Sequence, residues 1–313
     1  MPRRTMVARV SRPVDFFSEV ARLLAGAFSK RAQARCLRGG LSLGVFRRLQ
    51  YGVLTCTLSA AVSSHASPAT DEGWRDLAGY LFRDAHDAFT RDAAGSDRQR
   101  ALGAAASLLN DPPVTAGKVA QAEAQLRELL AANAADEPAL YARYLLARIA
   151  HLHRPAEIAE IERAYRDVIA ASPAHPLAQL AAGKLALVLL YQRPDLTVSQ
   201  RLAAAAALAP VAGADRLPET ACSYYRILAE AALYYDVIDE RVLAWLQRAA
   251  ALGPRDVMTA TSLRLQLAEV ARALGERDAA LAYYREYLAA AVPTDNRYRT
   301  AADHMAEVAK GTQ

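Results

Sequence analysis

The sequence predicts an all-α fold made of antiparallel helix pairs stacked side by side. Ala and Leu are abundant, whereas the 313 residues include only 15 Gly and 14 Pro. This composition favours helix because Ala and Leu lose little side-chain freedom there. Apolar residues also recur at steps of three and four, the period that lines one helical face. Proline and glycine interrupt this pattern often, and the resulting short helix pairs bury their apolar faces by stacking on neighbouring pairs.

The charge of the chain is divided unevenly along its length. The net charge is +5, but residues 1–66 hold eleven Lys or Arg and two Asp or Glu. Residues 67–313 hold the remaining 27 cationic and 31 acidic side chains, a net charge of 27 − 31 = −4. Because a duplex-binding surface needs clustered cations and the two signs are interspersed here, we expect no nucleic-acid partner.

Residues 41–66 have the pattern of a secretory signal peptide. Arg47-Arg48 precede an uncharged run, which ends at Ser64-His65-Ala66 with small residues where a signal peptidase cuts. We therefore expect export, with cleavage near Ala66. The run is too short and too rich in Ser and Thr for a membrane span, which needs about 20 apolar residues.

The status of residues 1–40 is open between two interpretations. Either translation starts near Leu41 or Val45, or residues 1–40 form a leader in which Val14–Leu37 is an amphipathic helix able to lie on an anionic membrane. A lipid anchor at Cys56 is a further alternative, although Thr55 departs from the small residue that bacterial lipid-anchor motifs carry before the cysteine.

The body begins with a predicted first helix, Asp71–Ala93, inside a segment 67–97 that ends at Ala94-Gly95-Ser96. Residues 98–293 then contain five predicted helix pairs, each interrupted or closed by proline or glycine. These pairs are Arg98–Asn110 with Thr115–Asn133, Pro138–Leu152 with Pro155–Ala171, Pro176–Gln192 with Thr197–Leu208, Pro218–Asp236 with Asp239–Leu252, and Asp256–Leu274 with Glu276–Ala291. In residues 294–313, Thr294–Ala309 is predicted to be a capping helix, with a polar outer face that keeps the end of an array soluble.

Small and bulky residues alternate in these pairs in a recurring pattern. Its best copy is Leu267, Ala268, Ala271, Gly275, Ala280 and Tyr284, followed by Pro293. Two further copies run from Tyr225 to Pro254 and from Leu146 to Pro173. On these residues, roughly 98–310 resemble the tetratricopeptide repeat (TPR) family. The resemblance implies a right-handed α-solenoid, although the closing prolines 173, 210, 254 and 293 are 37, 44 and 39 residues apart instead of the regular 34.

In TPR proteins the first helix of each pair lines a concave surface that holds peptide segments. Tyr141, Tyr144, Arg148 and His151 follow steps of three, four and three, so they share one stripe of a first helix. The resemblance places this stripe on the concave surface, together with Arg226, Glu230, Tyr234, Glu269 and Arg272. The alternative is that the tyrosines pack between helices. If the stripe binds a partner, replacing Tyr144 and Arg148 with alanine should abolish binding and leave stability nearly unchanged.

The sequence offers no grouping of residues that would support catalysis. It lacks a Gly-rich phosphate loop, a Gly-x-Ser-x-Gly elbow and a His-Glu-x-x-His helix. His151 and His153 are the only close histidine pair, and no neighbouring ligand completes a metal site. Glu157, Glu160 and Glu162 alternate with arginines, as on a solvated helix face. We therefore expect no catalytic residue, metal or cofactor, and we expect Cys222 to be a buried apolar residue.

These observations predict a non-catalytic scaffold or assembly factor of the bacterial cell envelope that binds a protein or peptide on its concave face. The expected location is the periplasm or the outer membrane, with membrane association through the N-terminal segment. Two alternatives remain open. One is an enzyme or enzyme accessory acting on cell-wall material, which would require a buried acid or base with a perturbed pKa in a pocket; two convergent carboxylates in the groove would favour it. The other is a cytoplasmic adaptor that retains its N-terminus.

Overall fold

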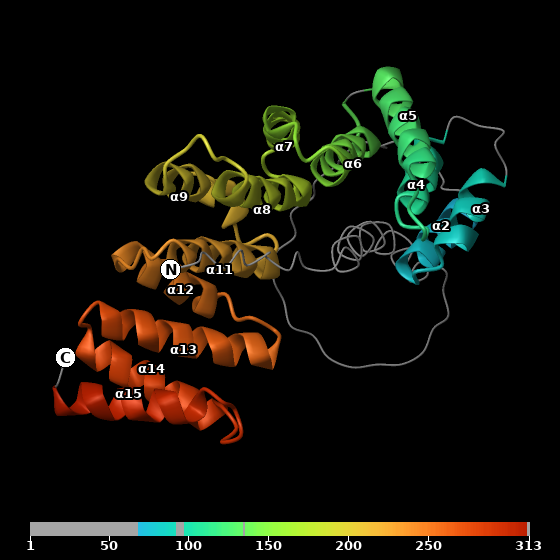
Figure 1. Cartoon of the computed structure of the whole chain (residues 1–313). Helices are drawn as coiled ribbons and strands as arrows, with labels where there is room; N and C mark the ends of the chain where they lie inside the picture. Colours follow the sequence, from blue (N-terminus) through green and yellow to red (C-terminus); the bar gives the residue numbers. More distant parts are fainter. Residues whose placement is uncertain (1–67, 92–96, 134, 312–313) are drawn as a thin grey trace, which may run out of the picture. The chain divides into compact units, whose positions relative to one another are not determined.

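The computed structural model describes residues 68–91, 97–133 and 135–311, and this part of the chain is all-α with 14 helices (Figure 1). The prediction of an all-α fold is confirmed. The leader, the signal peptide, the cleavage site near Ala66 and the alternative anchor at Cys56 lie outside the described residues. Among the residues that are described, no helix is both long and apolar enough to cross a membrane.

The chain divides into two compact units, and the division falls within helix α6, after Ala142. The first unit contains α2 (Pro68–Ala78), α3 (Phe82–Thr90), α4 (Arg98–Leu108), α5 (Ala116–Ala132) and the start of α6 (Glu137–His153). Here α2 packs on α3, α3 on α4, and α4 on α5. The order of the helices along the chain is therefore also their order of contact.

The second unit contains the rest of α6 and the nine helices that follow it. These are α7 (Ile158–Ala171), α8 (Pro176–Tyr191), α9 (Val198–Ala206), α10 (Ala209–Ala212), α11 (Pro218–Tyr234), α12 (Glu240–Ala251), α13 (Val257–Ala273), α14 (Arg277–Ala290) and α15 (Tyr298–Lys310). From α7 to α9 and from α10 to α15, each helix packs on the next one in sequence. The helix α8 also packs directly on α10 and α11, so two first helices lie side by side. Figure 1 shows α11 to α15 as successive antiparallel layers.

Polar caps explain why several helices start where the sequence predicts. Thr115, Asp239 and Asp256 each accept a hydrogen bond from a backbone N–H in the first turn of α5, α12 and α13. Thr197 and Gln200 form a reciprocal capping box at the start of α9. Such side chains satisfy backbone donors that have no partner within the helix. Helix starts could therefore be predicted from local sequence.

The prediction of a single helix over Asp71–Ala93 is wrong, because two helices occupy this segment. The first, α2, ends at Ala78, and Tyr80 takes a left-handed conformation with φ 64°. The N–H of Leu81 then donates to the carbonyl of Asp76 at 2.9 Å, which closes the helix end. Gly275, with φ 78°, ends α13 with an equivalent bond between Glu276 and Ala271. The segment is thus a helix hairpin of the same kind as α13 and α14.

Close packing around Phe89 holds this first hairpin together. A Cβ atom at Gly73 of α2 would lie 2.7 Å from the Phe89 ring, and one at Gly103 of α4 would lie closer still. Both contacts are shorter than real Cβ atoms allow. Trp74 packs edge-on against the same ring, with 4.9 Å between the ring centroids. Phe89 therefore fits because glycine occupies both neighbouring positions.

A short extra helix, α10, accounts for the longest spacing between closing prolines. The sequence predicts one helix from Thr197 to Leu208, but α9 ends at Ala206 and α10 follows it. Gln179 of α8 is fully buried and fixes this turn. Its amide nitrogen donates to the carbonyls of Ala212 and Leu217. Its carbonyl oxygen accepts from the N–H of Leu217. The insertion is thereby anchored to the core through paired polar groups.

We predict that Tyr80→Gly stabilises the protein. A bulky residue in the left-handed region costs about 1–2 kcal/mol, and the greater freedom of glycine in the unfolded chain offsets about 0.5–1 kcal/mol of that gain. The free energy of unfolding, measured in urea, should therefore rise by about 0.5–1 kcal/mol. Gly275→Ala, which introduces a side chain at the equivalent position of α13, should lower it by about 1 kcal/mol. A loss of stability in Tyr80→Gly would contradict this account of the turn.

Candidate functional site

The predicted stripe of α6 is mostly buried. Tyr144 is 0% exposed, Arg148 is 6% exposed, and Tyr141 is also buried, while His151 is half-buried. In this structure a partner therefore does not reach Tyr141, Tyr144 or Arg148. Tyr141 and Tyr144 instead pack between helices, which is the alternative that the sequence left open. Replacing Tyr144 and Arg148 with alanine would remove buried groups, so the double substitution is not a clean test of binding.

A hydrogen-bond network joins this part of α6 to α7 and α8. Arg148 donates to the hydroxyl oxygen of Tyr165 at 3.2 Å, and this hydroxyl lies 2.9 Å from Nδ1 of His151. The side-chain amide of Gln192 lies 3.2 Å from Nε2 of His151, and the carbonyl oxygen of Gln192 is buried without a partner among the described residues. Turning this amide over lets Tyr165 donate to Nδ1 and lets Nε2–H donate to the carbonyl oxygen of Gln192. The network therefore fits a neutral histidine.

The surroundings of His151 also oppose its protonation. Burial lowers the pKa of His151 from 6.5 to about 4, and the positive charges of Arg148 and Lys184 contribute to the decrease. A buried imidazolium beside two cations is unfavourable because it loses hydration without gaining an anionic partner. His151 thus acts as a neutral link between helices near neutral pH.

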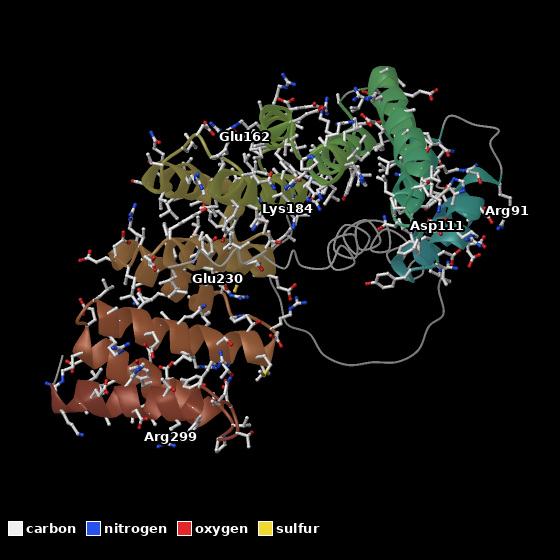
Figure 2. All side chains as sticks on the ribbon, viewed as in Figure 1. Arg91, Asp111, Glu162, Lys184, Glu230 and Arg299 are labelled. Atoms are coloured by element: carbon white, nitrogen blue, oxygen red, sulfur yellow. The ribbon has the colours of Figure 1, made fainter. Side chains whose placement is uncertain are left out.

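The exposed part of the predicted face lies on the first helices α8 and α11. Tyr191 is 45% exposed and Tyr234 is 65% exposed, and their rings meet edge-to-face with 6.3 Å between centroids. On α11, Arg226 donates to Glu230 at 2.9 Å. Figure 2 shows Lys184 on α8 and Glu230 on the neighbouring α11. We call Lys184, Tyr191, Arg226, Glu230 and Tyr234 the α8–α11 face.

The carboxylate of Glu230 lies close enough to the tyrosine end of this face to affect Tyr191. Burial raises the pKa of Tyr191 to about 12, and the carboxylate of Glu230 and the neighbouring Tyr235 and Tyr234 contribute to the rise. Because α8 ends at Tyr191 and α11 ends at Tyr234, both helices also direct their C-terminal carbonyls here. The tyrosine end therefore disfavours a further negative charge.

Glu269 connects the last three helices of the chain. Its carboxylate accepts hydrogen bonds from Arg272 at 2.8 Å and from the hydroxyl of Tyr284 at 2.8 Å, and it lies 2.8 Å from Nδ1 of His304 on α15. Although burial acts to raise the pKa of Glu269, the bonds from Arg272, His304 and Tyr284 lower it overall. The structure thus places Glu269 and Arg272 side by side, as partners of each other.

Sequence reasoning missed Tyr191 and His304. Tyr191 follows Lys184 by seven residues on α8, a spacing that places both on one helical face, so periodicity could have identified it. His304 belongs to the predicted capping helix, and no local signal pairs it with a residue 35 positions earlier. Only the packing of α15 brings the two together.

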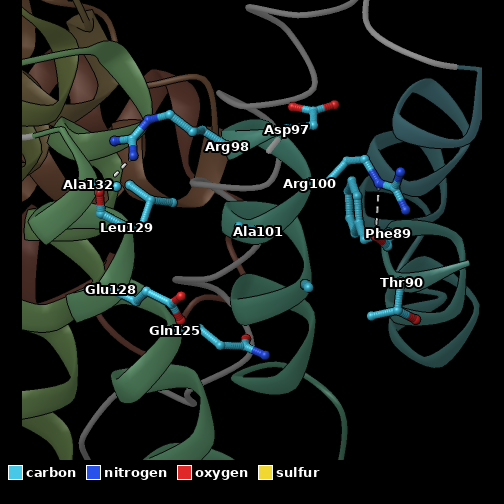
Figure 3. A pocket seen from close by; sticks show the side chains of 11 residues that line it. Phe89, Thr90, Asp97, Arg98, Arg100, Ala101, Gln125, Glu128, Leu129 and Ala132 are labelled. Atoms are coloured by element: carbon cyan, nitrogen blue, oxygen red, sulfur yellow. Dashed lines mark hydrogen bonds between the residues drawn. The ribbon is translucent and has the colours of Figure 1, made fainter. Parts of the chain in front are cut away.

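The first unit contains an open cavity of about 380 Å³ between α3, α4 and α5, shown in Figure 3. Two arginines line it, but they point away from each other. Arg98 binds Asp136 and the backbone carbonyls of Leu129 and Asn133, while Arg100 donates to the carbonyl of Phe89 at 3.0 Å. Both guanidinium groups thus secure helix ends or turns around the cavity.

Among the described residues, Cys222 and the histidines do not form a shared site. Cys222 is buried, as predicted, and its thiol donates to the carbonyl of Ala249. Burial raises the pKa of this thiol, which keeps it protonated near neutral pH. In the described part of the chain, no three His, Cys, Asp or Glu side chains are grouped in a way that could hold a metal ion.

Comparisons with known proteins give matches among solved structures. The chain is similar to TTC0263, a thermophilic TPR protein of Thermus thermophilus, with 21% identity, a TM-score of 0.37, and coverage of 67% of this chain and 99% of that one. It is also similar to yeast Tom70, with 14% identity, a TM-score of 0.30, and coverage of 82% and 67% respectively. No family model matches the sequence, and a search of curated proteins found no match.

The helix pairs themselves are TPR-like. The pattern residues of the last pair are buried where the two helices meet, namely Leu267, Ala268, Ala271, Ala280 and Tyr284, and Gly275 forms the turn between them. Small residues let the helices approach closely, and the tyrosine fills the space between them. The described chain is therefore an all-α, TPR-like helical repeat structure.

We predict that His151 makes the protein less stable in acid. The folded pKa of about 4 lies below the ordinary value of 6.5, so the unfolded chain binds the proton more readily between these values. The contribution of His151 to stability is therefore complete above pH 6.5 and is lost as the pH falls through 4. Its size should be on the order of 1–3 kcal/mol. Urea unfolding of His151→Gln across this range should show a flatter pH dependence than wild type, and an equal slope would contradict the prediction.

Proposed function

We propose that this protein is a non-catalytic scaffold that binds a protein or peptide partner along the α8–α11 face. The observation that carries the proposal is the pair of exposed tyrosine rings, Tyr191 and Tyr234, held at the ends of two first helices that pack on each other. Aromatic side chains supply large contact areas with few rotatable bonds, so they commonly dominate binding energy. The rigid helices below them keep the rings in place before the partner arrives.

The charges on the face add to this support. Arg226 and Glu230 form a half-buried ion pair beside the rings, and Lys184 lies on the same face of α8 as Tyr191. Such groups contribute to selectivity and to the rate of association more than to affinity. A partner that meets both the rings and the charges would be recognised by shape and by electrostatic fit.

The carboxylates nearest this face do not favour the enzymatic alternative. Glu230 is paired with Arg226, and the pKa of Glu269 is lowered by its hydrogen bonds, which keeps Glu269 ionised. A general acid on cell-wall material would instead need a carboxyl group with a raised pKa. We therefore propose binding, without a chemical step, as the function of this face.

We further propose that the scaffold acts in the bacterial cell envelope after export. The support is the sequence pattern of residues 41–66, with two arginines, an uncharged run and Ser64-His65-Ala66. Residues 67–313 have a net charge of −4, whereas the whole chain has a net charge of +5, so the exported part would be acidic. The partner would then be an envelope protein or a peptide segment of one.

Binding can be tested with the full-length chain and a random peptide library displayed on phage. We expect selected peptides to lose about tenfold or more in affinity when Tyr191 and Tyr234 are both changed to alanine, because hot-spot aromatics contribute about 1–2 kcal/mol each. Circular dichroism and thermal melting should remain close to wild type, since neither ring belongs to the buried core.

Tyr283→Ala is the matched control, because Tyr283 lies on the second helix α14 and bonds to Gln247 of α12. Peptides selected on wild type should bind this variant with unchanged affinity. If the control weakens binding as much as the double variant does, or if neither affects it, the peptide site lies elsewhere and the proposal fails.

Export can be tested by determining the N-terminus of the mature protein in its native host. We expect a start at or near Ser67, because signal peptidase cuts after small residues such as Ala66. Mass spectrometry of the purified protein provides the measurement. A mature chain that still begins at Met1 would contradict export and favour the cytoplasmic adaptor.

A further inference from the structure

We propose that Tyr191, Tyr234 and Glu230 form a recognition site for an arginine side chain of the partner. This inference rests on the proposed function and specifies the chemistry of the partner: an extended segment that presents at least one arginine. The site lies where α8 and α11 end side by side, entirely within the second unit.

The first element of the site is exposed aromatic surface. The rings of Tyr191 and Tyr234 stand at 69° to each other with 6.3 Å between centroids, so they form a corner and not a closed stack. Both remain open to solvent, at 45% and 65% exposure. A guanidinium group within about 6 Å of such a ring is attracted by the negative face of the π system, and its flat shape stacks on the ring.

The second element is negative charge beside the rings. Glu230 lies one helical turn before Tyr234, and it is among the groups that raise the pKa of Tyr191, so its charge reaches the phenol. One carboxylate oxygen of Glu230 accepts a hydrogen bond from Arg226. The C-terminal carbonyls of α8 and α11 add partial negative charge at the same place. An acidic side chain would be repelled here, and a cationic one attracted.

Tyr235, which follows Tyr234 in the sequence, already binds an arginine of this chain in the same way. The guanidinium carbon of Arg201 lies 5.8 Å from the centroid of the Tyr235 ring, and Arg201 also donates to the hydroxyl of Tyr235 at 3.2 Å. The ring of Tyr235 lies 5.1 Å from that of Tyr234. Among the described residues, no cation stacks on the ring of Tyr191 or Tyr234. An arginine from the partner would extend this series of rings and cations.

The test uses the full-length chain with ring-labelled tyrosines and N-acetyl-arginine amide as the probe. Tyr191→Phe and Tyr234→Phe each remove one tyrosine signal from the carbon–proton NMR spectrum, which assigns the resonances and leaves both rings in place. We expect saturable shifts of these two resonances. N-acetyl-citrulline amide, which has nearly the same shape but no charge, should produce no shifts at equal concentration.

Two variants separate the contributions of the ring and the carboxylate. Tyr234→Ala and Glu230→Gln should each weaken arginine binding about fivefold, the effect expected from one exposed cation–π contact or one exposed ion pair. Tyr234→Phe should bind as wild type does, because the ring face and not the hydroxyl is used. Tyr283→Ala, on α14, should also bind as wild type does.

The inference is overturned if citrulline shifts the same resonances as arginine, if Glu230→Gln binds arginine undiminished, or if the two resonances do not move up to the solubility limit of the probe. The phage selection separates this failure from failure of the proposed function. If peptides depend on Tyr191 and Tyr234 but carry no excess of arginine, only the arginine site is wrong. If no selected peptide depends on these rings, the proposed function fails as well.

Discussion

The packing of large aromatic rings against very small residues is the constraint on which the first and the last helix hairpins depend. Phe89 fits only because Gly73 and Gly103 leave room for its ring. At the other end of the chain, Tyr284 shares a buried cluster with Ala268 and Ala280. Burying one such ring contributes about 2–3 kcal/mol, and the small residues let two helix backbones approach closely enough to enclose it. Each enclosed ring thereby fixes the spacing of the helices that surround it.

Because most of these rings are tyrosines, they also bring hydroxyl groups into the interior. Each hydroxyl needs a partner there, since a buried polar group without one destabilises the fold. Tyr224 donates to the carbonyl of Ala205, Tyr284 donates to Glu269, and Tyr165 joins His151 and Arg148. These bonds run between helices, so they set the register of one helix against the next as well as their separation.

This arrangement decides which residues remain available for binding. Tyrosines in the middle of a helix, such as Tyr144 and Tyr165, are enclosed by neighbouring helices. Tyr191 and Tyr234 are the last residues of α8 and α11, where coverage stops, so the rings are supported on one side and open on the other. A surface that is both rigid and exposed suits the recognition of a flexible segment, because the scaffold loses little conformational entropy when it binds.

The sequence by itself determined the helical fold class and the location of most helices, because periodicity, caps and proline are local signals. It could not reveal the turn at Tyr80, since a bulky residue in the left-handed region is rare and the adjacent Gly79 alone does not end a helix. Periodicity also showed that Tyr141, Tyr144 and Arg148 share a face of α6, but not that this face is buried. Tertiary packing decided that, because a helix stripe becomes core or surface according to what packs on it. The same packing joined Tyr191 to Tyr234 and Glu269 to His304, pairs that lie 35 or more residues apart.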